Sequence, residues 1–399
     1  MAARVMARIK PEVLVWARTS SGFGREQAAM HLGIDDARLA AWEAGDDAPS
    51  IPQLRKLATL YKRPLAVFYL QEVPAGFQVL RDLRRLPGTG FRYLPASIQI
   101  EIRRASQRRE LALEMLDELG EEVAPFRIAA TVSDDPEEIG IRIRTALGVT
   151  EQVQASWRDP DGRAAFNAWR SRIEEAAVLV FQATQVSSED ASGFAIAESR
   201  LPVIVINRKD PPTRRTFSLL HEFTHLMLRV SGVSDLEADA IRPPEDQAIE
   251  VFCNQVAAAA LMPRSWLLTD SRIINQGIRS TNWSDPEISD LARMFGVSRE
   301  AVVRRLLTFD RTTETFYRAK RSQYAAERAL REQRQREKAA DSEIRRNMPQ
   351  ETLSNFGRPL VHMILGNYYQ DRLSLSEVAG YLGIKTKHIP KLENLTGLR

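Results

Sequence analysis

Residues 215–230 read RTFSLLHEFTHLMLRV. This stretch contains HEFTH at 221–225, an HExxH sequence within an apolar run. Four residues make slightly more than one turn of an α-helix, so both imidazoles project from one face and can bind one metal ion. Glu222, next to the first histidine, can take a proton from a water molecule at that metal. A histidine pair among leucines is costly to bury unless a metal occupies it.

A zinc site of this kind needs a third protein ligand, and the next helix supplies a candidate. The sequence EDQAIEVFCNQVAAAALM at 245–262 predicts a helix that Pro263 ends. Glu250 lies on it, and its carboxylate would complete a His2Glu site. Cys253 and Asn254 follow three and four residues later on the same face. Asn254 would support a ligand or pack the helix, and Cys253 would be a fourth ligand or a small buried side chain.

Other polar residues compete with this assignment. Four carboxylates precede Glu250 in the chain: Glu237, Asp239, Glu245 and Asp246. A ligand on a helix is better positioned in advance than one on a loop, which favours Glu250. His31, His362 and His388 lie far from the motif in the sequence, and we expect them to be packing or surface residues.

The first 70 residues predict several short helices with a break at Gly33, as in a helix-turn-helix. They resemble the Cro/repressor-type helix-turn-helix family through Gln27, Ala28, Gly33, Ile34, Leu39, Trp42, Glu43, Gly45 and Pro49. The segment 33–47, which would read DNA, has five acidic residues against one basic residue, Arg38. Since phosphate contacts supply much of the affinity for DNA, we expect this domain to bind protein rather than DNA.

Three further segments make a second resemblance specific. They are RTFSLLHEFTHLML, EVFCN at 250–254 and LMP at 261–263, preceded by SGFAIA and VIVINR. Together they are similar to the ImmA/IrrE metallopeptidase family, many of whose members carry a Cro-like helix-turn-helix in front. The C-terminal LSLSEVAGYLGIK resembles the tails of longer members. The resemblance implies a Zn2+ ion held by His221, His225 and Glu250, with Glu222 as catalytic base. It also implies cleavage of helix-turn-helix repressors that control phage, mobile-element or stress-response genes.

The element order predicts an α+β fold that is mostly helical. VLVFQAT, SGFAIA and LPVIVINR are candidate strands of a small mixed sheet beside the metal-binding helix. We expect a helix-turn-helix domain at 1–72 and a linker with a connecting helix at 73–135. A zinc metallopeptidase domain at 136–310 follows. The last region, 311–399, is predicted to be helical, with a long basic helix and a helix-turn-helix-like end.

Composition limits the cellular setting and the competing functions. A single cysteine permits no disulfide within the monomer, and no signal peptide or membrane span is visible, so we expect a cytoplasmic protein. The net charge of +4 is concentrated at 318–346, which is typical of a solvated helix. Alternatively, Tyr317, Tyr324 and Arg321 would suit a groove that binds single-stranded nucleic acid. The alternatives to a peptidase are a DNA-binding regulator with a non-catalytic metal-sensing or ligand-sensing site, and a peptide-binding scaffold.

Overall fold

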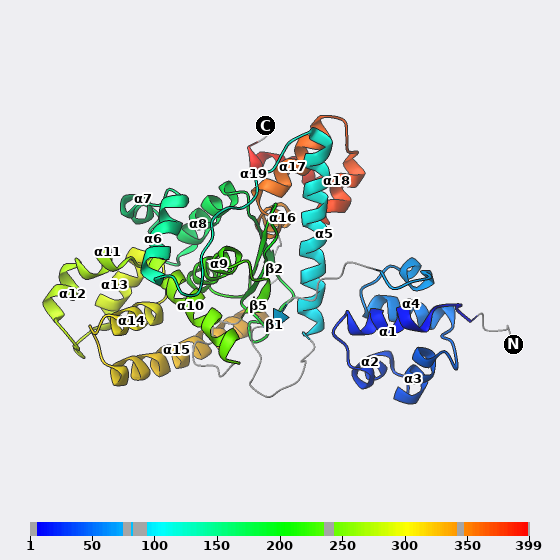
Figure 1. The fold of residues 1–399 in the computed structure, drawn as a ribbon, viewed down its shortest axis with the longest axis horizontal. Helices are drawn as coiled ribbons and strands as arrows, with labels where there is room; N and C mark the ends of the chain where they lie inside the picture. Colours follow the sequence, from blue (N-terminus) through cyan, green and yellow to red (C-terminus); the bar gives the residue numbers. More distant parts are fainter. Residues whose placement is uncertain (1–5, 75–80, 83–93, 235–242, 341–346, 398–399) are drawn as a thin grey trace.

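The computed structural model describes residues 6–74, 81–82, 94–234, 243–340 and 347–397 of the chain. Helices surround one small sheet, and a separate helical domain at the N-terminus lies to the right in Figure 1. The predicted fold class, α+β and mostly helical, is confirmed.

The N-terminal domain is a bundle of short helices around its own apolar core. Its elements are α1 (Pro11–Thr19), α2 (Arg25–Leu32), α3 (Asp36–Ala44), α4 (Ile51–Leu60) and the 3-10 helix η1 (Leu65–Tyr69). Gly33 ends α2 with a φ of 66°, a left-handed conformation that glycine adopts without strain. Asp35 then caps α3 by accepting a hydrogen bond from the amide of Ala37. Leu39 and Trp42 of α3 are buried in the core, so the predicted helix-turn-helix is present.

The sheet contains five short strands in the order β1-β5-β3-β4-β2. They are β1 (Arg81–Asp82), β2 (Leu179–Ala183), β3 (Gly193–Ile196), β4 (Val203–Asn207) and β5 (Gly232–Ser234). β2 runs parallel to β4, whereas β3 is antiparallel to both β4 and β5. The three predicted strands are therefore confirmed. β1 and β5 lie where a linker and a loop were expected. Strands of two or three residues are too short to show an alternation of polar and apolar side chains, and their pairing depends on the tertiary fold.

Helices cover both faces of the sheet, as alternate strand residues point to opposite sides. Val180 and Ile206 share one core with the helix that carries HEFTH, whereas Phe181 and Val205 share another with a long helix and the C-terminal helices. The first layer contains α6 (Pro136–Ala146), α8 (Arg163–Glu175), α9 (Pro212–Met227) and α10 (Pro244–Leu261). The second layer contains α5 (Ala96–Leu119), α16 (Met348–Phe356) and α17 (Arg358–Tyr369). Figure 1 shows α5 and α17 on one side of the strands and α9 on the other.

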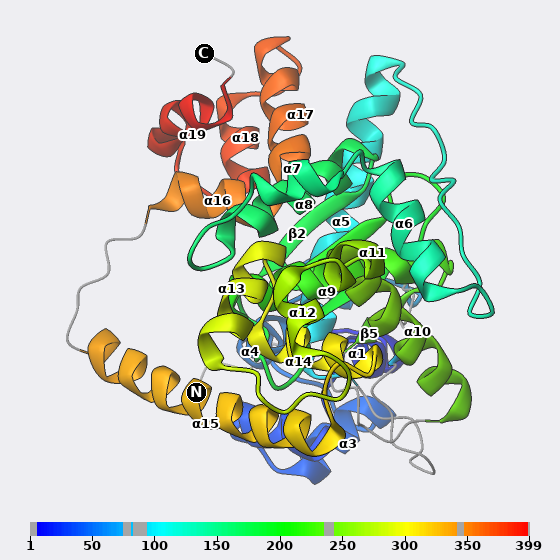
Figure 2. The same ribbon diagram turned by 90° about the vertical axis from the view of Figure 1, so that its left-hand side faces the viewer.

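The remaining helices extend the two layers. They are α7 (Glu151–Ala155), α11 (Arg264–Leu268), α12 (Ser271–Gln276), α13 (Asp285–Phe295), α14 (Arg299–Thr308), α15 (Glu314–Ala340), α18 (Leu375–Leu382), η2 (Thr386–His388) and α19 (Ile389–Thr396). The long helix α15 packs on α14 and then extends away from the body, as Figure 2 shows. Tyr317 and Tyr324 of α15 are only 5% and 6% exposed. The idea that they stack on bases in a single-strand groove is therefore wrong, because their rings are used in packing.

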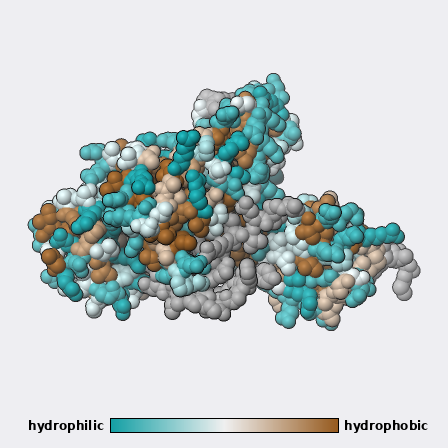
Figure 3. All heavy atoms as spheres, viewed as in Figure 1, coloured by the Kyte–Doolittle hydropathy of each residue, from teal (hydrophilic) through white to brown (hydrophobic). Residues whose placement is uncertain are grey.

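Apolar surface is uneven around the molecule. Apolar residues gather at the end that carries α11 and α12 (Figure 3), where Ile274 and Ile278 are 60% and 72% exposed. Within the described ranges, no helix combines the length and the apolar character needed to cross a membrane.

Candidate metal centre

The HEFTH sequence lies in the C-terminal half of α9, which is deeply buried. Every residue of α9 from Ser218 to Met227 is buried, and Pro212 begins the helix where no amide donor is needed. Leu219, Leu220 and Phe223 join the core beneath the sheet. The two histidines lie one turn apart on the side that meets α10, the helix that packs against α9.

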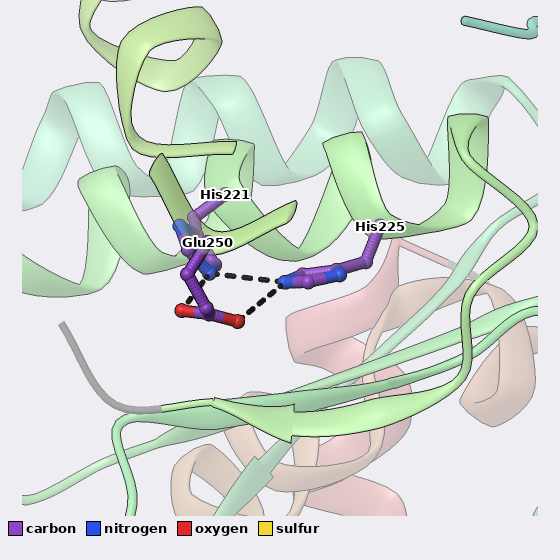
Figure 4. A group of neighbouring side chains, drawn as sticks. All are labelled: His221, His225 and Glu250. Carbon is purple, nitrogen blue, oxygen red and sulfur yellow. Dashed lines mark hydrogen bonds and ion pairs between the residues drawn. The ribbon is translucent and has the colours of Figure 1, made fainter. Parts of the chain in front are cut away.

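His221, His225 and Glu250 converge on one point, as Figure 4 shows. The two Nε2 atoms of the histidines are 3.1 Å apart. Glu250 places Oε2 at 3.5 Å from the Nε2 of His221 and Oε1 at 3.2 Å from the Nε2 of His225. Tetrahedral ligands at about 2.1 Å from zinc are separated from one another by about 3.4 Å. The three side chains therefore match the donor set and the spacing of a zinc site.

The electrostatics of the cluster also suit a cation. All three side chains are buried. Burial would raise the pKa of Glu250, but the adjacent imidazoles lower it well below its usual range. Burial lowers the pKa of His225, and the neighbouring His221 lowers it further. Burial opposes protonation of His221 too, yet attraction to Glu250 raises its pKa overall. The carboxylate thus favours positive charge beside it, which a bound metal ion would supply.

Glu222 is fully buried and lies against strand β3. A Cβ atom built on Gly193 would be 3.1 Å from the Oε1 of Glu222 and 2.8 Å from the carbonyl oxygen of Val205. Only glycine leaves room for the Glu222 side chain at this distance. Gly193 was not singled out in the sequence, although a glycine inside a strand is a known sign of close approach.

Asn254 and Cys253 occupy different positions relative to the ligands. The Oδ1 of Asn254 is 3.1 Å from the Nδ1 of His221. An Nδ1–H that donates to this oxygen leaves Nε2 free to bind a metal. Cys253 is fully buried and is not part of the converging group. Burial, aided by the negative charges of Glu250 and Glu222, raises the pKa of its thiol, which favours the protonated form.

Of the competing carboxylates, the two that the structure describes are not part of the group. Glu245 is exposed, and Asp246 is buried one turn before Glu250 without joining the cluster. Glu237 and Asp239 lie outside the described residues. In the part of the chain that the structure describes, His221, His225 and Glu250 form the one group of His, Cys, Asp and Glu side chains able to hold a metal.

The distant histidines make other contacts. His362 places its Nε2 at 3.1 Å from the carbonyl oxygen of Thr396, and His31 packs edge-on against Phe23. His388 is half-buried before α19.

Comparison with known protein families assigns the region around this cluster. Residues 174–307 match a peptidase family described as an IrrE N-terminal-like domain. The similarity to that domain extends over these residues. A second match, to the helix-turn-helix family, covers residues 14–68. The predicted combination of an ImmA/IrrE-type domain with a Cro-like helix-turn-helix is thus confirmed. The matched residues 174–307 contain the sheet strands β2 to β5 and all three converging side chains. No curated protein matches the chain.

Proposed function

We propose that the protein is a zinc-dependent endopeptidase that cleaves a partner repressor of the helix-turn-helix type. The observation that supports this most directly is the buried group of His221, His225 and Glu250, with Glu222 beside it on the same helix. The match to a peptidase family agrees with it. The resemblance to ImmA/IrrE proteins suggests that cleavage would release phage, mobile-element or stress-response genes from repression. We place this reaction in the cytoplasm.

The chemistry assigned to the chain is peptide-bond hydrolysis. Zinc, when bound, polarises the scissile carbonyl and acidifies water. Glu222 accepts one proton as the water oxygen bonds to the carbonyl carbon. It then returns that proton to the amide nitrogen as the C–N bond breaks. Because Gly193 lies close to it, the Glu222 side chain has little freedom to move. It therefore needs little conformational change before it accepts a proton. Asn254 keeps the His221 ring in one orientation.

The decisive test separates metal binding from cleavage. We expect the purified protein to bind one zinc ion and to cleave the repressor encoded near it. Glu222→Gln keeps the volume of the side chain but removes the base, so zinc content stays unchanged while cleavage falls by about 100-fold or more. Metal analysis and mass spectrometry of the fragments measure the two quantities. His225→Ala should lose both zinc and cleavage.

A matched control is available on α10. Glu245→Gln makes the same chemical change at an exposed carboxylate near the metal-binding helix pair, and we expect native zinc content and native cleavage. Cleavage at the native rate by Glu222→Gln would exclude Glu222 as the base. Zinc binding together with salt-dependent, sequence-specific DNA binding and no proteolysis would favour a regulator with a non-catalytic metal site instead.

The N-terminal domain is assigned the role of docking the protein substrate. Asp35, Asp46 and Asp47 are exposed around α3, and small Ala37 offers little to a base edge. A repressor of the helix-turn-helix type carries a basic DNA-binding face, to which an acidic face is complementary.

This docking role predicts a change in substrate affinity without a change in chemistry. Asp35→Ser keeps the helix cap, and combining it with Asp46→Lys changes the net charge of residues 33–47 from −4 to −1. The KM for the repressor should rise by about tenfold while kcat stays native, because the metal group is untouched. Glu122→Lys, an equivalent change in an exposed loop, is the control and should alter neither constant. A native KM in the double variant would remove the docking role.

A further inference from the structure

Three helix–glycine–helix units in this chain share the same turn. Gly33, Gly296 and Gly383 end α2, α13 and α18 with φ values of 66°, 69° and 63°. In the first two units the next helix begins three residues after the glycine. In the third unit the 3-10 helix η2 begins at that position and leads into α19. The equal geometry allows their exposed residues to be compared position by position, counted from the glycine.

The second unit is covered by the rest of the protein. Its second helix, α14, packs against α15. Arg299 pairs with Glu327, and Glu300 lies within ion-pair distance of Arg328. Arg299 and Glu300 of this helix are thus engaged with α15.

The first and third units are both open but carry opposite charge. Two, four and eight residues after Gly33 stand Asp35, Ala37 and Ala41. The same three positions after Gly383 are Lys385, Lys387 and Lys391. All three lysines are exposed, and so are Thr386 and Asn394 between and beyond them.

The apolar positions of the two open units coincide, which shows that the same face looks outward. Leu39 and Trp42 stand six and nine residues after Gly33. Ile389 and Leu392 stand at the same distances after Gly383, and all four side chains are buried. The lysines therefore lie on the face that a recognition helix presents to DNA.

Negative charge near the three lysines is limited. Glu393, on α19, is only 3% exposed. Glu377 is held in the capping box at the start of α18, where its carboxylate accepts hydrogen bonds from the amide and hydroxyl of Ser374. Tyr381, 41% exposed at the end of α18, adds a hydroxyl that can reach a phosphate.

The C-terminal unit is fixed to the body of the protein on its other side. α16 packs on β2 and α19, and α17 packs on α5. Figure 1 shows α17, α18 and α19 at the same end as the C-terminus, away from the N-terminal helix-turn-helix. A rigid support of this kind holds the exposed face in one orientation.

We propose that residues 373–397 bind double-stranded DNA, with η2 and the start of α19 entering the major groove. Lysines on this face supply phosphate contacts and can donate to guanine, and Thr386 and Asn394 can contact further base edges. The A-form major groove of RNA is too narrow for a helix, so DNA is the duplex that fits. This inference does not depend on the peptidase function.

The test measures the affinity and salt dependence of the full-length chain for a fluorescent 30-base-pair duplex of random sequence. The key variant, Lys385→Ala with Lys387→Ala and Lys391→Ala, removes three charges from the exposed face. Each lost phosphate contact lowers the slope of log affinity against log salt by about 0.9, so the slope should fall by about 2 to 3. Affinity at low salt should fall by about tenfold or more.

The matched control removes three charges from the exposed part of α15, by Arg328→Ala, Arg331→Ala and Arg334→Ala. It should keep native affinity and slope. Equal loss in both triple variants, or native binding by the lysine variant, would overturn the proposal. Tighter binding to single-stranded RNA or to an acidic polypeptide than to the duplex would overturn it as well. Native zinc content and native circular dichroism show that each variant folds.

Discussion

Among single residues of the candidate metal centre, one glycine is as notable as the proposed ligands. Gly193 begins β3 directly beside Glu222, and its missing side chain leaves the space that the Glu222 carboxylate uses. The proposed base is thereby held between its own helix and the sheet. A small residue that makes no chemical contribution of its own can thus set the position of the group assigned to proton transfer.

Gly193→Ala should damage cleavage more than metal binding. The new Cβ would lie 2.8 Å from the carbonyl oxygen of Val205, so either β3 or Glu222 must move. We expect a loss of roughly 1–3 kcal/mol in the free energy of unfolding and a large fall in cleavage rate, with zinc content retained. Denaturant unfolding, metal analysis and the cleavage assay measure these effects. Gly380→Ala, where a Cβ meets nothing within 4 Å, is the control and should not destabilise the protein.

At the scale of helices, the position of Glu250 depends on how α10 packs against α6. A Cβ on Gly140 of α6 would be 2.7 Å from the Cβ of Ala259, so the two backbones are in close contact. Arg144, also on α6, donates a 2.8 Å hydrogen bond to the carbonyl oxygen of Ala260. α6 therefore determines where α10, and with it Glu250, lies relative to α9.

Gly140→Ala should loosen the metal site from a distance. The added methyl group pushes α6 and α10 apart, which should lower the free energy of unfolding by roughly 1–3 kcal/mol. Zinc affinity should fall because Glu250 moves with its helix, and competition with a chelator measures that change. Ile141→Ala on the same helix removes a side chain that is 58% exposed and should change neither quantity appreciably. Native zinc affinity in Gly140→Ala would show that α10 is positioned by other contacts.

At the scale of the whole molecule, the N-terminal domain is attached to the central body through the start of α5. Arg103 of α5 is buried and donates hydrogen bonds to the hydroxyl of Ser21 at 3.1 Å and to the carbonyl oxygen of Tyr61 at 3.3 Å. A Cβ on Gly22 would lie 2.4 Å from the carbonyl oxygen of Leu94, so the turn after α1 is in close contact with the chain that enters α5.

Arg103→Met should release the helix-turn-helix domain without changing the metal site. It leaves buried acceptors without their donors, which costs about 1–3 kcal/mol. We expect faster limited proteolysis between η1 and α5, with native zinc content. Arg104→Met is the matched control, since this neighbour is 41% exposed and pairs with Glu101 on the same helix. Equal proteolysis rates in the two variants would contradict this account of the contact.

The limits 1–72, 73–135, 136–310 and 311–399 stay predictions for the extent of each domain. α5, expected to connect two domains, covers a face of the sheet, and α16 to α19 share that core. Sequence periodicity found these helices but did not indicate what they pack against, because an apolar stripe is the same whatever partner it meets.

Local features were predictable from the amino-acid sequence: the helix that carries HEFTH, the glycine turns of the helix-turn-helix units and the three longer strands. These follow from periodicity, capping and the conformational freedom of glycine, which act over a few residues. The sequence favoured Glu250 as the third ligand, and the folded chain brings this residue, rather than Asp246 or Glu245, to the two histidines. The contact of Gly193 with Glu222 is visible only in the folded chain. The tertiary structure also decided which helix-turn-helix faces are open and which is covered. Such contacts join residues far apart in the chain, so no local pattern contains them.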